Sequence, residues 1–357
     1  MINPFTSITL NSKSHSETKL ASLCLSILAS ASLQAWEYSL YRFILQWISD
    51  EEFIKVKTSG STGNPKEISI SKKSMVASAN LTGDFLKLQK GDKALLCLPV
   101  DYIAGKMMVV RAFVLGLDLI SSESTGNPLK NKNEYFDFAA MASMQVFNIL
   151  NERSGIEKLN NIKNLIIGGG EINPALKHKL QILKNNTFHT YGMTETITHI
   201  ALKKINSEDK NARFVALNDV WFEQDKRDCL IIHAPHISNE SIITNDIVNL
   251  KNKTDFEFIG RYDNIINSGG IKIIPEIIEK KIEAFVNQRL FIYGKPDEKL
   301  GEKLVLVIEG KPDKQFEKTL EKIPFSKYEK PKEILFIKQF METGNGKINR
   351  GKTLLTQ

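Results

Sequence analysis

The stretch KTSGSTGNPKEI (57–68) combines residue types that can grip a phosphate group. Its glycines let the backbone bend so that successive N–H groups face one anion, while serine and threonine hydroxyls add donors. Lys66 supplies a positive charge at the end of the run. A flexible, solvated turn has a similar composition, but the Pro-Lys step at this spacing, directly after the predicted strand FIKV, favours phosphate binding.

A second cluster, TYGMTETITH (190–199), follows the end of another predicted strand. The ring of Tyr191 can stack on a base, and the Glu195 carboxylate beside the Thr194 hydroxyl can hold Mg²⁺ against phosphate oxygens. A Thr-Glu pair can equally well cap a helix, so the cluster by itself leaves both interpretations open.

The segment GNGKINRGKT (344–353) contains the spacing of a Walker loop, from Gly346 to Thr353. Such a loop must open a helix whose N-terminal amides point at the phosphates, and only four residues follow Thr353. The Walker interpretation therefore fails. What remains is a single lysine, Lys347, which could act on a nucleotide bound elsewhere.

The elements that would position these residues alternate between apolar runs and helical stretches. KALLCLPV, IKNLIIGGG and NTFHTYG are typical of strands, and AGKMMVVRAFVLG, AAMASMQVFNILN (139–151) and NPALKHKLQIL of helices. This alternation predicts an α/β fold with a parallel sheet covered by helices and ligands at the carboxyl ends of the strands. Past Gly260 the pattern restarts in a smaller unit, so we expect domains at 1–260 and 261–357.

The N-terminal run LASLCLSILASASLQA (20–35) resembles the apolar part of a signal peptide, but serines interrupt it. Its apolar residues share one helical face, and Ser14 with Glu17 predicts a capping box before it. We therefore expect an amphipathic core helix in a cytoplasmic protein. Nothing approaches the ~20 apolar residues that span a bilayer, so no membrane partner is expected.

Composition narrows the class further. The chain has 357 residues, of which 42% are apolar, and it has a net charge of +7. Because lysines and acidic residues are interspersed, the charge suits anionic small substrates at least as well as nucleic acid, and we expect no nucleic-acid partner. The three cysteines are scattered, which argues against a disulfide framework. Cys229, His233 and His236 could form a metal cluster, but their segment alternates like a strand.

Taken together and in this order, TSGSTGNPK and YGMTE resemble signatures of the acyl-adenylate-forming enzymes, the superfamily of acyl-CoA synthetases, peptide-synthetase adenylation domains and luciferases. GRYDNIINSGGIKIIPEIIE (260–279) resembles the hinge and glycine-loop motif of that family, and GNGKINR its C-terminal lysine motif. The match is collinear from about residue 54 to the C-terminus. It implies a large adenylation domain, a small mobile α+β lid, and the ligands ATP, Mg²⁺, CoA and a small carboxylic acid.

The resemblance also implies a role for each motif residue. Mg²⁺ would be held by Glu195, and Thr194 would lie against the phosphates. The residues that would hold the phosphates are Thr58, Ser59, Gly60, Ser61, Thr62, Gly63 and Lys66. Those that would line the adenine, ribose and acyl sites are Gly168, Gly169, Gly170, Tyr191, Asp246 and Arg261.

In this family Lys347 would bridge the substrate carboxylate and the α-phosphate, two anions that repel each other. Asp263 would be the hinge. Its rotation would withdraw Lys347 and bring Gly269 and Gly270 to the site, where missing side chains leave room for the pantetheine arm of CoA.

The sequence departs from the family pattern at several positions. Asn245 stands before Asp246 where the family has glycine, and Asn267 replaces the usual lysine after the hinge. Asp101-Tyr102 replaces an aromatic-His pair, which leaves the role of Tyr102 in the acid pocket open. The region before Thr58 is shorter than in typical members.

This short chain with its INSGG hinge most resembles the o-succinylbenzoate–CoA ligases of bacterial menaquinone biosynthesis. That acid has two carboxylates, so the one that is not activated needs a cation or several donors, and Lys106 and His199 are the candidates. Two other functions remain open. The chain could adenylate another aryl or acyl acid or use a carrier-protein acceptor, or it could bind nucleotide without catalysis. The last is disfavoured because Lys66, Glu195, Asp246, Arg261 and Lys347 are all present.

Overall fold

The structure is a computed structural model that describes residues 6–57, 67–172, 174–207, 209, 212–286, 288–342 and 348–355. The chain divides into two compact units. The first comprises Met1–Ile172, Leu176–Val220 and Ala234–Glu240, and the second Asn173–Ala175, Trp221–His233 and Ser241–Gln357. The domain boundary predicted at residue 261 stays a prediction.

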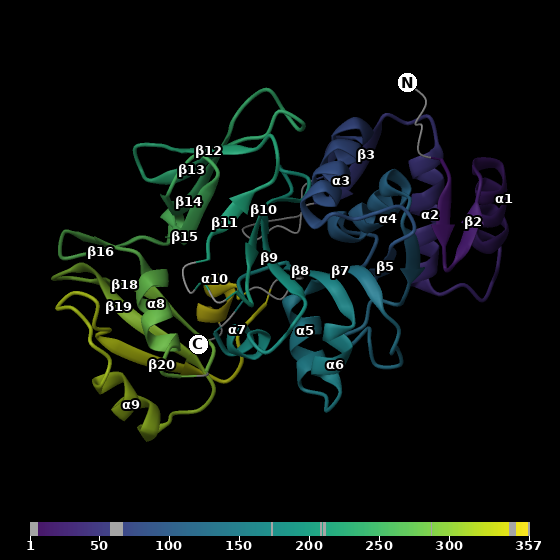
Figure 1. Ribbon diagram of the computed structural model, residues 1–357. Helices are drawn as coiled ribbons and strands as arrows, with labels where there is room; N and C mark the ends of the chain where they lie inside the picture. Colours follow the sequence, from purple (N-terminus) through teal and green to yellow (C-terminus); the bar gives the residue numbers. More distant parts are fainter. Residues whose placement is uncertain are drawn as a thin grey trace. The chain divides into compact units, whose positions relative to one another are not determined.

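The first unit is built on a mixed sheet in the order β11-β10-β9-β8-β7-β5-β6-β1-β2 (Figure 1). The strands are β1 (Ile8–Leu10), β2 (Lys13–His15), β5 (Lys93–Leu96), β6 (Asp118–Ser121), β7 (Phe136–Ala142), β8 (Ile162–Gly168), β9 (Asn186–Gly192), β10 (His199–Lys204) and β11 (Phe214–Ala216). Strands β1, β6, β5, β7, β8 and β9 run parallel, as predicted for this region. A separate antiparallel pair is formed by β3 (Phe53–Lys57) and β4 (Glu67–Ser71).

The sheet is nevertheless not parallel throughout. Strands β10 and β11 follow β9 in antiparallel order, and β2 pairs antiparallel with β1. Only residues 193–198 separate β9 from β10, which is too short a connection for the crossover that parallel strands require. The prediction of a wholly parallel sheet was therefore wrong on this side of the sheet.

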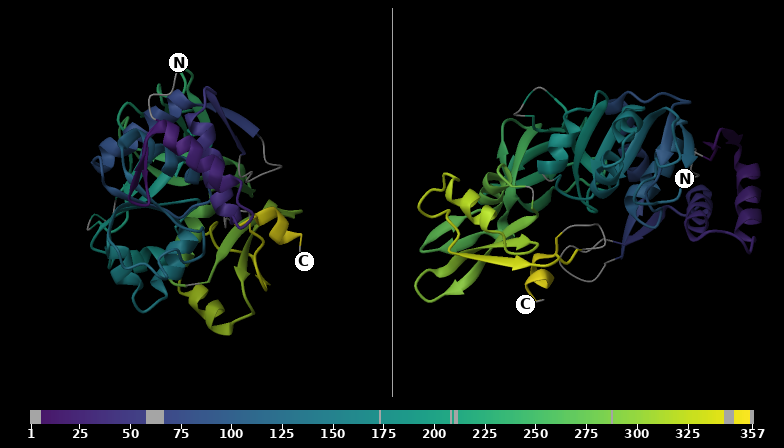
Figure 2. Two further views of the ribbon diagram at one scale, coloured as in Figure 1. Left: turned by 90° about the vertical axis from the view of Figure 1, so that its right-hand side faces the viewer. Right: turned by 90° about the horizontal axis from the view of Figure 1, so that it is seen from below.

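Helices cover both faces of the parallel strands. Along the chain they are α1 (Glu17–Leu28), α2 (Ala35–Ile48), α3 (Lys72–Leu86), α4 (Ile103–Leu115), α5 (Ser143–Leu150), α6 (Gly155–Asn160) and α7 (Pro174–Leu180). Helices α5 to α7 bury Val146, Ile149 and Leu176 against one face. On the other face, Arg111 of α4 lies 5.9 Å from the Phe138 ring of β7. Helices α1 and α2 pack against each other (Figure 2, purple).

Two local predictions were wrong. Residues 139–142, predicted to begin a helix, are the end of β7, because the strand is buried in the middle of the sheet and tertiary packing overrides the helical preference of alanine. The predicted capping box at Ser14 is also absent. Ser14 belongs to β2, and α1 begins one residue after Ser16, whose side chain makes no capping hydrogen bond.

The second unit begins with an antiparallel set of strands in the order β12-β13-β14-β15. These are β12 (Trp221–Gln224), β13 (Cys229–His233), β14 (Ile242–Leu250) and β15 (Asp255–Arg261). The strand predicted for the segment that starts at Cys229 is confirmed. A 3₁₀ turn, η1 (Tyr262–Asn264), leads out of β15.

The C-terminal part holds a second sheet in the order β17-β16-β19-β18, with β20 parallel to β19. Its elements are β16 (Ile266–Ser268), β17 (Ile271–Ile273), α8 (Pro275–Glu283), β18 (Leu290–Asp297), β19 (Gly301–Glu309), α9 (Lys314–Glu321), β20 (Glu333–Ile337) and α10 (Arg350–Leu354). One face packs Ile278 of α8 and Phe316 of α9 onto Ile292. The opposite face packs Phe291 with Leu354 of α10. None of the helices in the described part of the chain is both long and apolar enough to cross a membrane.

Candidate active site

The edge where β8 and β9 end carries the predicted glycine turn. A side chain at Gly168 would lie 2.7 Å from the hydroxyl of Thr190 on β9, so only glycine fits there without a shift. Gly169 has a φ of +88°, a conformation that favours glycine. The carbonyl of Gly170 lies 2.9 Å from Nε2 of His189. Neighbouring side chains of β9 therefore contact the backbone of this turn, and the glycines add no side chains of their own.

Tyr191 belongs to an aromatic group at the same end of β9. Its ring centroid lies 5.6 Å from that of Phe214 on β11, and the Phe214 ring lies 5.3 Å from that of His189. Tyr191 is half-buried, which leaves part of the ring accessible. A fixed aromatic face next to a glycine turn is suited to stacking on a flat base.

The turn that bears Thr194 and Glu195 is tied down from within. The buried Thr196 hydroxyl accepts a hydrogen bond from the Met193 amide (2.8 Å) and donates to the Thr198 carbonyl (2.7 Å). Thr194 and Glu195 begin no helix, so the helix-cap interpretation is excluded. Glu195 is exposed. A single carboxylate on such a turn fits a Mg²⁺ ion whose other ligands are phosphate oxygens and water.

Beneath this turn lies a buried polar cluster, made of Ser78 and Thr82 on α3, Arg111 on α4, and Thr198 and His199 after the turn. The Ser78 and Thr198 hydroxyls are 3.0 Å apart, and the Thr82 hydroxyl lies 3.3 Å from Nε2 of His199. An Nη2 hydrogen of Arg111 is donated to the Thr198 hydroxyl over 3.5 Å. The cluster joins two helices to the residues that follow Glu195.

Arg111 is the unusual member of the cluster. It is 2% exposed, and its Nε has no hydrogen-bond partner among the described residues. Its other contacts are the Met108 sulfur and the Phe138 ring, and no carboxylate of the described chain pairs with it. Burial lowers the pKa of Arg111 to about 9, so the guanidinium is still charged at neutral pH. The charge thus has no anion within this part of the protein.

His199 carries no charge of its own at neutral pH. Burial, assisted by the nearby charge of Arg111, holds the pKa of the His199 imidazole well below its usual value. At pH 7 the cluster therefore presents one cation, several hydroxyls and a neutral imidazole. Such a set of donors suits a carboxylate.

The other two residues predicted for the acid pocket, Tyr102 and Lys106, lie just before α4 and in its first turn. The Lys106 amine is 4.5 Å from the centroid of the Phe43 ring on α2, and burial lowers the pKa of Lys106. Tyr102 precedes the first residue of α4 and is 45% exposed. The structure thus groups His199 with Arg111, which sequence reasoning missed. The available signal was an arginine in the otherwise apolar stretch MMVVRAFVL.

In the second unit, the predicted ribose and hinge residues form one polar network. Asp246 on β14 is opposite Arg261 on β15, and their side chains are joined over 3.2 Å. Arg261 also donates to Asp263 in η1 (2.8 Å). Asn245, the departure from the family pattern, donates to the other oxygen of Asp263 (3.0 Å) and accepts from Arg227 (3.0 Å). The Asp263 carboxylate is therefore held from two sides.

Gly269 and Gly270 form the turn between β16 and β17, with φ values of +58° and +81°. No atom outside their immediate neighbourhood would lie within 4 Å of a side chain at Gly270. The glycines are thus required by the backbone conformation of the turn.

Several predicted residues lie outside the described residues, namely Thr58, Ser59, Gly60, Ser61, Thr62, Gly63, Lys66 and Lys347. The segment 58–66 connects β3 to β4, whose end residues Lys57 and Glu67 are paired. The position of Thr353, which is a described residue, also argues against a Walker loop. Thr353 lies inside α10, is fully buried, and accepts a hydrogen bond from the Met341 amide through its hydroxyl.

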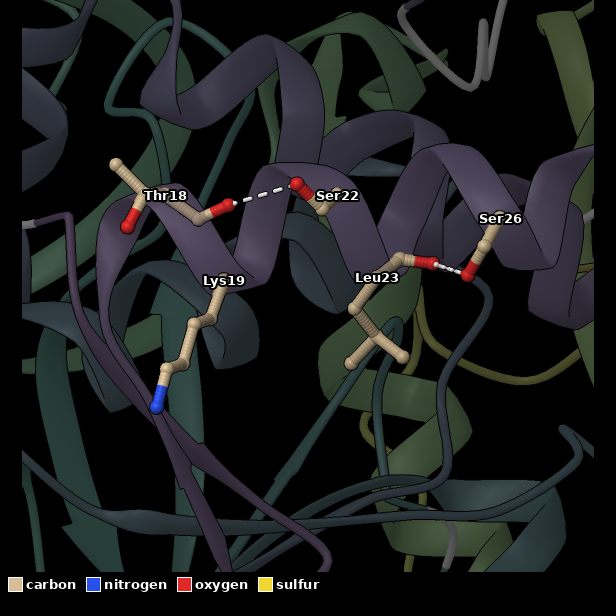
Figure 3. Close-up of a pocket in the computed structure, with 5 residues that line it drawn as sticks. All are labelled: Thr18, Lys19, Ser22, Leu23 and Ser26. Carbon is tan, nitrogen blue, oxygen red and sulfur yellow. Dashed lines mark hydrogen bonds between the residues drawn. The ribbon is translucent and has the colours of Figure 1, made fainter.

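A surface hollow on α1 has no comparable chemistry (Figure 3). Its serines are bonded within their own helix, Ser22 to the Thr18 carbonyl (3.1 Å) and Ser26 to the Leu23 carbonyl (2.8 Å). Among the described residues that line the hollow, Lys19 is the one that carries a charge.

Residues 57–216 match the family model described as AMP-binding enzyme. An acyl-CoA synthetase (AMP-forming)/AMP-acid ligase II-like protein from Dyadobacter fermentans is 36% identical to this chain. The match covers 94% of this chain and 98% of that chain, with a TM-score of 0.64. The chain belongs to the AMP-binding enzyme family.

Other relatives of this AMP-binding enzyme agree with the assignment. The 2-succinylbenzoate–CoA ligase of Listeria monocytogenes is 27% identical over 83% of this chain and 68% of its own length. The o-succinylbenzoate coenzyme A synthetase of Bacillus subtilis, in complex with ATP and a magnesium ion, has the same fold with a TM-score of 0.71, at 17% identity over 91% of this chain and 78% of its own. The chain is thus an adenylate-forming ligase of the acyl-CoA synthetase type.

Proposed function

We propose that this enzyme activates a carboxylic acid that has a second carboxylate, in the first place o-succinylbenzoate, and transfers the acyl group to CoA. The observation that carries the proposal is the buried Arg111, whose guanidinium has no carboxylate partner in the described part of the chain. An uncompensated cation in a protein interior is costly. A ligand that brings its own second carboxylate would remove that cost.

The position of Arg111 agrees with this role. Its guanidinium contacts Thr198, four residues after Thr194 in the turn that we assign to Mg²⁺ and phosphate. An acid whose reactive carboxylate lies beside the turn would extend its second carboxylate toward the buried cluster. There Arg111 would pair with it, while Ser78, Thr82 and neutral His199 add hydrogen-bonding groups.

The reaction would proceed in two steps. In the first, a carboxylate oxygen of the acid attacks the α-phosphorus of ATP and the bond to pyrophosphate breaks. In the second, the CoA thiolate attacks the acyl carbon and the bond to the AMP oxygen breaks. When bound, Mg²⁺ would neutralise phosphate charge, and Glu195 would hold it.

The chain's own residues would supply the remaining contacts. The loop 58–66 would hold the phosphates, Tyr191 would stack near the adenine, and Asp246 would accept the ribose hydroxyls. Lys347 would place a cation between the two anions of the first step, where its charge matters most in the transition state. Gly269 and Gly270 would admit CoA in the second step, with Asp263 as the hinge.

The names of relatives support the choice of acid. The Listeria relative is a 2-succinylbenzoate–CoA ligase, and the Bacillus subtilis protein of the same fold is an o-succinylbenzoate coenzyme A synthetase. Arg111 adds an argument that does not depend on these names, because it explains why a dianionic acid would be preferred.

The test is acid-dependent pyrophosphate release, followed by addition of CoA. We expect release and thioester formation with o-succinylbenzoate. The matched control, 4-oxo-4-phenylbutanoate, lacks the ring carboxylate and should be used at least ~10-fold less efficiently because it leaves Arg111 unpaired. Equal use of both acids would contradict the role of the second carboxylate. Release without thioester would indicate a carrier-protein or other acceptor, and no release with any acid a silent nucleotide-binding protein.

A further inference from the structure

The described chain resumes at residue 348, just after Lys347, and its first helix, α10, is anchored by Arg350. Arg350 begins α10, three residues after Lys347, and α10 is capped by the Asn349 side chain, which accepts from the Lys352 amide (3.0 Å). A helix this short gains little stability from its own hydrogen bonds. Its position must therefore come from contacts with the rest of the unit.

Those contacts form a clasp around the edge strand β18. Arg350 donates to the Ile292 carbonyl (3.2 Å), while the Ile292 amide donates to Glu279 of α8 (2.7 Å). The Arg350 guanidinium then pairs with the other Glu279 oxygen (2.9 Å) and lies 5.5 Å from the Phe291 ring. Strand β18 pairs only with β19 among the described strands, so Ile292 offers both backbone groups at an open edge.

The clasp joins elements on opposite faces of the C-terminal sheet. Ile278 and Ile282 of α8 belong to the core on one face, and Leu354 of α10 packs on the other. The Arg350–Glu279 pair passes around β18 and connects the two. Among the described residues, the ion pairs of Arg350 with Glu279 and Glu276 are the charged links between α8 and α10.

Glu276 extends the clasp to the turn after β15. It is 5% exposed, lies 3.9 Å from Arg350, and accepts a hydrogen bond from the Asn264 side chain (2.5 Å). Asn264 is the last residue of η1 and follows Asp263. Hence a continuous polar chain runs from Asn264 through Glu276 and Arg350 to Glu279.

We propose that Arg350 is a positioning residue for Lys347, held by Glu276 and Glu279, and that Asn264 couples this clasp to the turn that contains Asp263. The inference rests on the proposed function in one respect, the assignment of Lys347 to adenylate formation. Arg350 itself would touch no substrate. It would hold the start of α10, three residues after Lys347, at a fixed place relative to α8, so that a change in η1 is passed to the chain next to Lys347.

The test separates the two half-reactions in Arg350→Met, Arg350→Lys and Asn264→Ala. We expect Arg350→Met to slow adenylate formation from o-succinylbenzoate on the order of 10²-fold, because a misplaced catalytic group costs about that much. Thioester formation from chemically prepared o-succinylbenzoyl adenylate should change by less than about 2-fold. Arg350→Lys should recover part of the loss. Asn264→Ala keeps the Arg350–Glu279 pair and should lose roughly 3- to 10-fold in the first half-reaction alone.

The matched control is Lys281→Met, which removes another ion pair of α8, to Glu329 at 2.7 Å, away from the clasp. It should leave both half-reactions unchanged. If Arg350→Met lost activity equally in both half-reactions, or lost none in either, the inference about Arg350 would be wrong. The proposed function would still stand, because it is tested on the wild-type enzyme.

A second readout keeps the test independent of the acid. Amide hydrogen exchange of the peptide 348–355 should become faster in Arg350→Met and stay at the wild-type rate in Lys281→Met. Unchanged exchange in Arg350→Met would refute the anchoring by Arg350. By contrast, a wild-type enzyme that did not use o-succinylbenzoate would contradict the proposed function and leave the anchoring untouched.

Discussion

Two arginines of this protein, one fully buried and one half-buried, have opposite surroundings. Arg111, in the first unit, is fully buried against Phe138 and hydroxyl groups, and no carboxylate of the described residues pairs with it. Arg350, in the second unit, faces two buried carboxylates, those of Glu276 and Glu279. Burial lowers the pKa of Arg111 to about 9, whereas it raises the pKa of Glu279 to about 7 even though Arg350 opposes the rise.

The difference teaches where each charge is balanced. Around Arg350 the fold supplies more negative charge than positive, so the arginine is satisfied when the chain has folded. Around Arg111 the described residues supply none, and we propose that the balancing anion is the second carboxylate of the acid. The first arrangement stabilises structure, and the second stores a cost that a ligand can relieve.

The largest effect is expected at Lys347 and sharpens the account of Arg350. Lys347→Ala should slow adenylate formation on the order of 10³-fold, because removal of a preorganised charge from the transition state costs about 3–4 kcal/mol. It should leave thioester formation from a preformed adenylate largely intact. If Arg350 acts only through Lys347, then adding Arg350→Met to Lys347→Ala should cause no further loss. Rapid-quench measurement of each half-reaction checks this, and a fully additive double mutant would disprove it.

Next in size is the loss at Arg111. Arg111→Met should lower kcat/KM for o-succinylbenzoate by about 30- to 1,000-fold, since a buried charge pair is worth about 2–4 kcal/mol. KM for ATP should stay near the wild-type value. The melting temperature should be unchanged or higher, because methionine buries no unpaired charge. A melting temperature several degrees lower with normal kinetics would instead make Arg111 a purely structural residue.

A pH titration of stability should distinguish the surroundings of the two arginines. Because the pKa of Glu279 is about 7 in the folded chain and ordinary in the unfolded chain, its contribution to stability is full at acidic pH, below the unfolded pKa of about 4.5. It is lost as the pH rises through about 7. The melting temperature of the wild type minus that of Glu279→Gln should therefore fall from pH 5 to pH 8. A difference that stayed constant would place the titrating group elsewhere.

The smallest effect is expected for a half-buried arginine whose ion pair is open to solvent. Arg227 pairs with Asp225 (2.7 Å), keeps 36% of its side chain exposed, and contacts Asn245, which holds Asp263. Ion pairs that water can screen contribute little to stability, so Arg227→Met should shift the melting temperature by less than about 2 °C. Thermal unfolding at low and high salt checks this. A clearly larger shift would show that the pair contributes more than a solvent-screened pair does.

Much of the parallel region could be predicted because its pattern is local. The strands β8 and β9 and the start of α7 follow from apolar runs and turn residues in the sequence. The turn from β9 into an antiparallel β10 was missed, as was the strand at residues 139–142. In both cases the outcome depends on neighbours in the sheet, which no short stretch of sequence specifies.

The candidate site shows the same division. Tyr191, Thr194 and Glu195 could be singled out by motif. The structure has Tyr191 near the end of β9, and Thr194 and Glu195 on the internally bonded turn that follows. Arg111 could not be singled out, because one letter in an apolar helix does not say whether an anion is near. The clasp around Arg350 was equally hidden, since its members lie 71 and 58 residues apart along the chain.

The amino-acid sequence by itself determined the family, the order of the motifs and the residue types available for chemistry. These depend on residue identity and spacing along the chain. The tertiary structure alone decided which charges are balanced by other charges of the described residues and which are not. The reason is physical: the free energy of a charge depends on burial and on the distance to other charges, and both exist only after the chain has folded.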